Sequence, residues 1–102
     1  MQPPTEAFKR LAPDLFRAVN KSMVGWKGGD PKGIFYQACY DVIGPGWISA
    51  YISFLEDSWG DSCRLLGIPP HSALDPDRTI LSTYLLVLAE SCGLDLDKVL
   101  GE

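Results

Sequence analysis

Residues 75–102, DPDRTILSTYLLVLAESCGLDLDKVLGE, give the clearest structural signal in this chain. Asp75-Pro76 is a helix start, because aspartate caps a helix N-terminus and proline fits the first helical position, which needs no N–H. Apolar residues then recur at helical spacing: Ile80, Leu81, Tyr84, Leu85, Leu88 and Cys92. Gly93 ends the run, so the sequence predicts a helix over 76–92 and a short helix over 95–100.

The N-terminal segment has the same periodicity but contains a proline. Its apolar residues keep a helical phase: Phe8, Leu11, Leu15, Phe16, Val19 and Met23. Pro13 lacks an N–H and clashes with the preceding turn. The sequence therefore predicts a short turn over 5–11 followed by a main helix over 13–24.

Two further helices are predicted in the middle of the chain. One begins at Asp30-Pro31, and Gly44-Pro45-Gly46 ends it. The next and longest covers Trp47–Leu66. Residues 47–55 also alternate as in a strand, but no partner strand is evident elsewhere, so helix is favoured.

Together these segments predict one all-α domain over residues 1–102, with four main helices and a short C-terminal helix. A chain of 102 residues supports one core, and its composition, 46% hydrophobic and 22% charged, is that of a globular protein. Trp47–Leu55 and Ile80–Ala89 contain no charged residue. A helix that is apolar on every side must be surrounded by protein. We therefore expect a homo-oligomer, most simply a two-fold dimer.

Charge is unevenly distributed along the chain. The net charge of −4 argues against nucleic acid as the main partner. Residues 1–33 carry six basic and three acidic groups, whereas residues 34–102 carry three basic and ten acidic groups. The favoured interpretation is that the two parts face each other, within the fold or across a subunit boundary. The alternative is a dedicated basic binding arm.

The cysteines and the hydropathy pattern both indicate a cytosolic protein. Cys39, Cys63 and Cys92 are odd in number and lie in apolar helical registers, as expected for free buried thiols in a reducing cytosol. No signal peptide is evident, and the longest charge-free run, Val42–Leu55, is too short to span a bilayer. We expect a soluble cytoplasmic protein that does not act at a membrane.

Acidic residues supply the only candidate metal ligands. Asp57 and Asp61 are four residues apart and share a helix face beside Glu56. Magnesium prefers such hard carboxylate oxygens, but a solvated acidic face is the more common role of these residues. Asp75, Asp77, Asp95 and Asp97 lie near helix starts, where capping explains them.

Aromatic residues form a loose series through the two central helices. Its members are Tyr36, Tyr40, Trp47, Tyr51 and Trp59. Such residues line apolar ligand pockets or anchor interfaces, and Tyr40, Trp47 and Tyr51 are the candidates for a small-molecule pocket. Packing in the core or at an interface is the favoured role.

Other sequence features give little support for catalysis. His71 lies in a Pro-rich connector without an evident orienting acid, and the cysteines lie in predicted core positions. The Gly25–Gly33 segment lacks the residue order of a phosphate-binding loop, so we interpret it as a helix–helix connection.

The segment Tyr84–Val99, YLLVLAESCGLDLDKV, resembles the final helices of the MazG-type all-α nucleoside triphosphate pyrophosphohydrolases. In that family, a Tyr-Leu-Leu helix ends in glycine, a hydrophobic residue, aspartate, leucine and an acid. The resemblance implies magnesium bound through Glu-Glu-x-x-Glu and Glu-x-x-Asp motifs. By position, Asp77 replaces the glutamate of the second motif, but Ile80 cannot ligate a metal. The nearest match to the first motif is Glu56–Asp61, whose third acid comes one residue late.

The sequence therefore favours a non-catalytic binding or regulatory module that acts as a homo-oligomer. It needs no cofactor and binds itself, another protein or a small molecule, with Tyr40, Trp47, Tyr51 and Trp59 as ligand or interface residues. The alternative is a magnesium-dependent pyrophosphohydrolase-like enzyme, or a degenerate relative of one. Its metal ligands would be Glu56, Asp57, Asp61 and Asp77.

Overall fold

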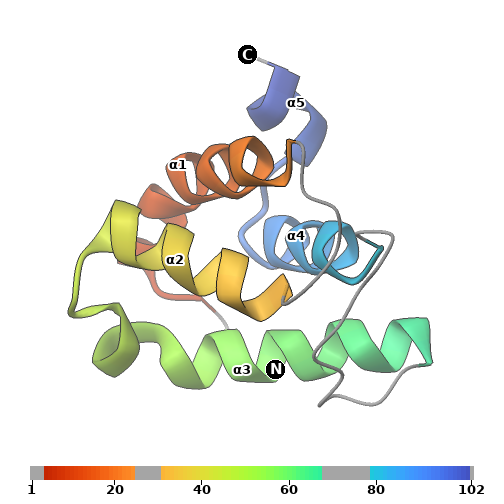
Figure 1. Cartoon of the computed structure of the whole chain (residues 1–102), viewed down its shortest axis with the longest axis horizontal. Helices are drawn as coiled ribbons and strands as arrows, with labels where there is room; N and C mark the ends of the chain where they lie inside the picture. Colours follow the sequence, from red (N-terminus) through yellow and green to blue (C-terminus); the bar gives the residue numbers. More distant parts are fainter. Residues whose placement is uncertain (1–3, 25–30, 68–78, 102) are drawn as a thin grey trace.

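The computed structural model describes residues 4–24, 31–67 and 79–101, and within these ranges all regular structure is helical (Figure 1). The helices are α1 (Glu6–Met23), α2 (Pro31–Ile43), α3 (Trp47–Leu66), α4 (Thr79–Ser91) and α5 (Leu96–Gly101). The prediction of an all-α fold with a short C-terminal helix is confirmed. The predicted start of the fourth helix, at Asp75-Pro76, lies outside the described residues.

Helix α1 is continuous, so the predicted break at Pro13 is wrong. Thr5 caps the helix N-terminus, and its hydroxyl accepts a hydrogen bond from the Phe8 N–H at 3.2 Å. Pro13 removes one helical hydrogen bond. Burial of apolar side chains on both sides of Pro13 offsets the lost hydrogen bond, because only a continuous helix places them on one face. These side chains are Phe8, Ala12, Leu15, Phe16, Val19 and Met23.

Helix α3 has the predicted bounds, and the strand alternative for residues 47–55 is wrong. Gly67 ends the helix in the left-handed conformation, with φ of 69°, which glycine adopts without strain. The buried hydroxyls of Ser58 and Ser62 donate to carbonyls one turn earlier, of Phe54 and Ser58 respectively. A long helix therefore carries two polar residues on its inner face without unpaired hydroxyls.

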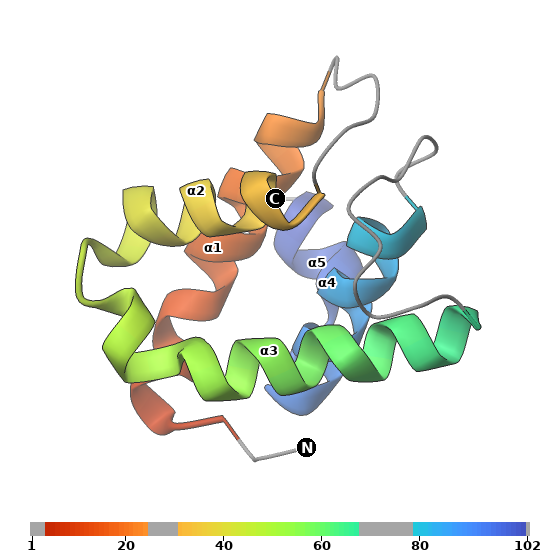
Figure 2. The ribbon, with the colours of Figure 1, turned by 60° about the horizontal axis from the view of Figure 1, so that its bottom comes forward.

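The helices surround one cluster of buried apolar side chains, and Figure 2 shows how their ribbons are arranged. Helix α1 packs on α2 and α5, and α3 packs mainly on α4. In Figure 1, α1 and α5 lie on one side of the molecule and α3 lies on the opposite side. The Tyr84 hydroxyl of α4 donates to the Leu55 carbonyl of α3 at 2.9 Å, which links the two helices at the centre of the core. No helix within the described ranges combines the length and the apolar composition that crossing a bilayer requires.

Candidate functional site

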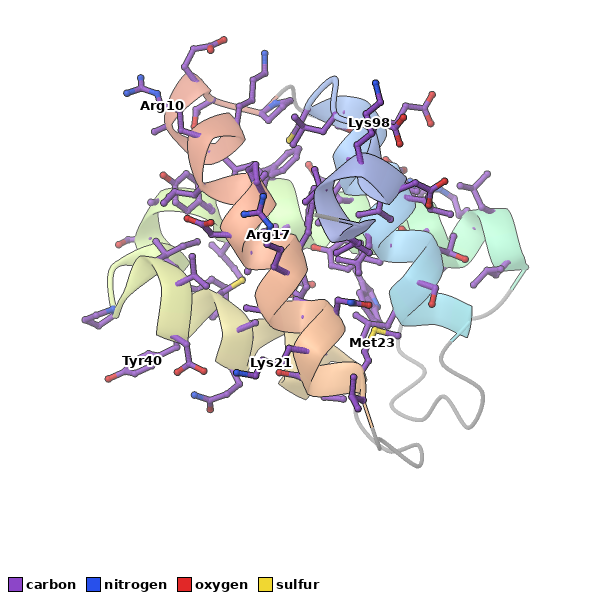
Figure 3. The ribbon with its side chains drawn as sticks, turned by 90° about the horizontal axis from the view of Figure 1, so that it is seen from above. Arg10, Arg17, Lys21, Met23, Tyr40 and Lys98 are labelled. Carbon is purple, nitrogen blue, oxygen red and sulfur yellow. The ribbon has the colours of Figure 1, made fainter. Side chains whose placement is uncertain are left out.

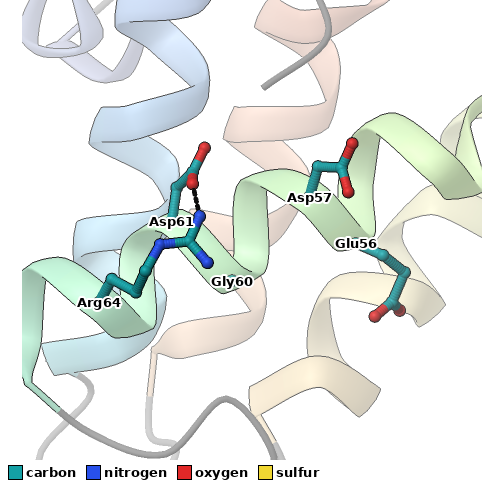
Figure 4. Close-up of a pocket in the computed structure, with 5 residues that line it drawn as sticks. All are labelled: Glu56, Asp57, Gly60, Asp61 and Arg64. Carbon is teal, nitrogen blue, oxygen red and sulfur yellow. Dashed lines mark hydrogen bonds and ion pairs between the residues drawn. The ribbon is translucent and has the colours of Figure 1, made fainter.

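Three acidic side chains on the outer face of α3 line a surface pocket of about 350 Å³ (Figure 4). They are Glu56, Asp57 and Asp61, and Gly60 and Arg64 complete the lining. Gly60 leaves room between the acids because it has no side chain. The structure thus brings together three of the four acids that the sequence singled out. Asp77 lies outside the described residues.

Glu56 is held by two groups from α2. The Lys32 ammonium lies 2.8 Å from Glu56 Oε2, and the Tyr36 hydroxyl donates to Glu56 Oε1. The same ammonium lies 5.6 Å from the centroid of the Trp59 ring and 5.8 Å from that of the Tyr36 ring, within the range of cation–π attraction. Glu56 therefore links α2 to α3, a role that its position in the sequence does not reveal.

The other two acids differ in their partners. Asp61 pairs with the Arg64 guanidinium one turn along the helix. Asp57 is exposed and forms no ion pair within the described part of the chain. No group of three histidine, cysteine or acidic residues is arranged to hold a metal ion among the residues that the structure describes. A cation that bound both Glu56 and Asp61 would have to compete with Lys32 and Arg64.

Three of the four predicted aromatic ligand or interface residues pack against other rings. Trp47 lies 4.8 Å from Tyr36, Tyr51 lies 5.3 Å from Phe8, and Trp59 lies 5.0 Å from Tyr84, as measured between ring centroids. Trp47 and Trp59 are buried and Tyr51 is half-buried. Tyr40 differs, because 54% of its surface is exposed. A small-molecule pocket near Tyr40, Trp47 and Tyr51 remains a prediction.

Exposed apolar side chains lie on both sides of the turn between α2 and α3. Tyr40, in the last turn of α2, and Ile48, in the first turn of α3, are 54% and 55% exposed. We call this surface the α2–α3 corner, and it consists of Tyr40, Ile43, Ile48, Tyr51 and Ile52, of which the other three are half-buried. Helical periodicity places Ile48 in phase with the buried Leu55, so spacing alone misses its exposure. The charge-free run Val42–Leu55 is the signal that identifies this surface.

The three cysteines are free and buried, as predicted. Burial raises the pKa of the Cys39 thiol to about 12 and also raises the pKa of Cys63 and Cys92, although nearby lysines act in the opposite direction on these two. A thiol needs to ionise to act as a nucleophile, so none of the three has the environment of a reactive cysteine. His71 and residues 25–30 of the predicted glycine-rich connection lie outside the described residues.

Comparison with known proteins gives no relative for this chain: no family model, no curated protein and no solved structure matches it.

Proposed function

We propose that this protein is a non-catalytic helical binding module that acts as a homo-oligomer, with the α2–α3 corner as the contact between copies. The observation that supports the proposal is the exposure of Tyr40 and Ile48 on two helices joined by one turn. Single exposed apolar residues are common on monomers, but grouped ones mark interaction surfaces.

The chemistry of the corner suits self-association. All of its residues except Tyr40 lie in the charge-free run Val42–Leu55, and the charge nearest to Tyr40 in sequence, Asp41, accepts a hydrogen bond from Gln37, so two copies could approach with few charges to bury. In a two-fold dimer, the same surface of each copy faces the other. Tyr40 supplies an aromatic ring with a hydroxyl at its rim, a residue type enriched at protein interfaces.

Substitution of Ile48 tests the contact. We expect Ile48→Glu to convert the oligomer into a monomer at low micromolar concentration, because it would bury an unpaired carboxylate between two copies. The measurement is molar mass by light scattering after gel filtration. The matched control is Leu86→Glu on α4, since Leu86 is 56% exposed and Ile48 is 55% exposed. A wild-type monomer, or equal effects of the two variants, would contradict the proposal.

A second candidate is the magnesium-dependent nucleoside triphosphate pyrophosphohydrolase implied by the MazG resemblance. One observation favours it: Glu56, Asp57 and Asp61 line one pocket. Two of these acids already have basic partners, which is why we rank this function second.

A thermal-shift series with nucleotides, with and without magnesium, separates the two functions. A ligand that binds only the native state raises the melting temperature by mass action. For the binding module, we expect no magnesium-dependent shift with any nucleoside triphosphate. A shift of several degrees with one nucleotide, lost in Asp57→Ala, would instead support the enzyme.

A further inference from the structure

The outer face of α1 carries a stripe of basic side chains (Figure 3). Arg10, Arg17 and Lys21 are exposed, and they follow one another at intervals of seven and four residues. At 100° per residue these positions fall within an arc of roughly 40°, and they extend along about 16 Å of the helix. We call these three residues the α1 stripe.

The stripe is only partly neutralised by neighbouring acids. Asp14 lies between its members and pairs with Arg17 at 3.0 Å. Arg17 also donates to the Val99 carbonyl at 3.3 Å, so it helps to hold α5 against α1. Arg10 and Lys21 form no ion pair within the described ranges. The two ends of the stripe are therefore positively charged groups open to a partner.

The pocket on α3 offers carboxylates of the opposite charge, although Lys32 and Arg64 already pair with Glu56 and Asp61. Asp57 contributes the uncompensated carboxylate, and Glu56 and Asp61 add acceptor oxygens beside the space above Gly60. Leu65, 71% exposed, lies two turns beyond Asp57 on α3, while Val24, 78% exposed, follows Lys21 on α1. Each charged surface thus ends beside an exposed apolar side chain.

The fold keeps these two surfaces apart within one molecule. Helix α1 contacts α3 near its N-terminus, where Phe8 packs on Tyr51 and Phe54, but the two helices otherwise lie on opposite sides of the molecule (Figure 1). Among the described residues, the ion pairs lie within α1, within α3, or between α2 and α3 through Lys32 and Glu56. Of the basic N-terminal part, Lys32 pairs with an acid of α3, and Arg17 contacts α5 through the Val99 carbonyl. The α1 stripe is left with its charge facing outward.

We propose that the α1 stripe of one copy docks on the acidic α3 pocket of a second copy. This inference rests on the proposed function only in taking a second copy as the partner, and it uses surfaces distinct from the α2–α3 corner. Contacts between two different surfaces are heterologous, so they form rings or open chains rather than a closed two-fold pair. Corner dimers would thereby join into larger assemblies.

The contact between the α1 stripe and the α3 pocket would consist mainly of exposed ion pairs, which limits its strength. Exposed ion pairs each contribute about 0–1 kcal/mol, and salt screens them over about 10 Å. The assembly should therefore be weak, rapidly reversible and sensitive to ionic strength, unlike an apolar contact at the corner.

A charge-swap experiment tests the inference. Sedimentation velocity of the full chain at low ionic strength should show species larger than the dimer, which shrink to the dimer at high ionic strength. Arg10→Glu with Lys21→Glu, or Asp57→Lys with Asp61→Lys, should weaken this further association roughly tenfold or more. An equimolar mixture of the two double variants should restore it, because each then carries the partner charge of the other. Glu90→Lys, an exposed acid on α4, controls for added positive charge elsewhere and should still assemble.

The outcomes separate this inference from the proposed function. A dimer of unchanged size at both ionic strengths overturns the inference and leaves the corner dimer standing. Larger species at low ionic strength that dissociate to monomers at high ionic strength support the inference and overturn the corner dimer. Folded double variants that fail to restore assembly when mixed, or that assemble alone like the wild type, also overturn the inference.

Discussion

Replacing Tyr84 by alanine should lower the free energy of unfolding by about 3–5 kcal/mol, the range for removing a large buried aromatic side chain. Tyr84 is 1% exposed and lies at the centre of the core. Its ring centroid is 4.7 Å from that of Phe35 and 5.0 Å from that of Trp59, so it joins α2, α3 and α4. Domains of this size are stable by about 5–15 kcal/mol, so the loss is a large fraction of the total.

The conservative variant Tyr84→Phe separates the ring from the hydroxyl. It keeps the aromatic contacts and removes only the hydrogen bond to the Leu55 carbonyl, which should cost about 1 kcal/mol. Urea unfolding followed by tryptophan fluorescence measures both variants, because the contact with Trp59 makes the signal local. Equal losses for the two variants would show that the hydroxyl, not the ring, dominates at this position.

The sequence predicts most of the helices because their ends carry strong local signals. Helix α3 has its predicted bounds because Gly44-Pro45-Gly46 precedes it and Gly67 ends it in a conformation that favours glycine. Pro13 shows where local rules fail. The hydrogen bond that Pro13 removes is a local cost, whereas the burial of the apolar residues on the inner face of α1 is a gain that depends on α2 and α5.

The candidate site is less predictable because its partners come from other helices. The spacing of Glu56, Asp57 and Asp61 places three acids near one another on a single helix. That Lys32 and Tyr36 meet Glu56 depends on how α2 packs against α3, across 24 and 20 residues of sequence respectively. Spacing within one segment contains no information about that packing.

Alkaline pH should destabilise this protein through the buried thiol of Cys39 and the buried phenol of Tyr84. Burial raises the pKa of Cys39 from its ordinary value of 9.0 to about 12. Burial is also the main cause that raises the pKa of Tyr84 well above 10.0, with smaller contributions from the charges of Cys39 and Glu56. Above about pH 9 the unfolded chain releases the Cys39 proton while the folded chain keeps it.

The folded state then binds more protons than the unfolded state, so the free energy of unfolding falls as the pH rises. The contribution of Cys39 is fully present below pH 9.0 and is lost between 9.0 and about 12, at about 1.4 kcal/mol per pH unit. Tyr84 adds a second loss that begins above pH 10.0, where the tyrosine of the unfolded chain ionises.

Urea midpoints measured from about pH 8 to about pH 11 would show this decline. In Cys39→Ala the decline should be shallower, with the remainder near pH 9 coming from Cys63 and Cys92, and in Tyr84→Phe only the part above pH 10.0 should be reduced. A wild-type midpoint that stays constant across the range would contradict the prediction, and so would a decline of equal slope in all three proteins. Because both groups are buried in α2 and α4, the pH at which the decline ends, not the pH at which it begins, reports how strongly the core excludes water.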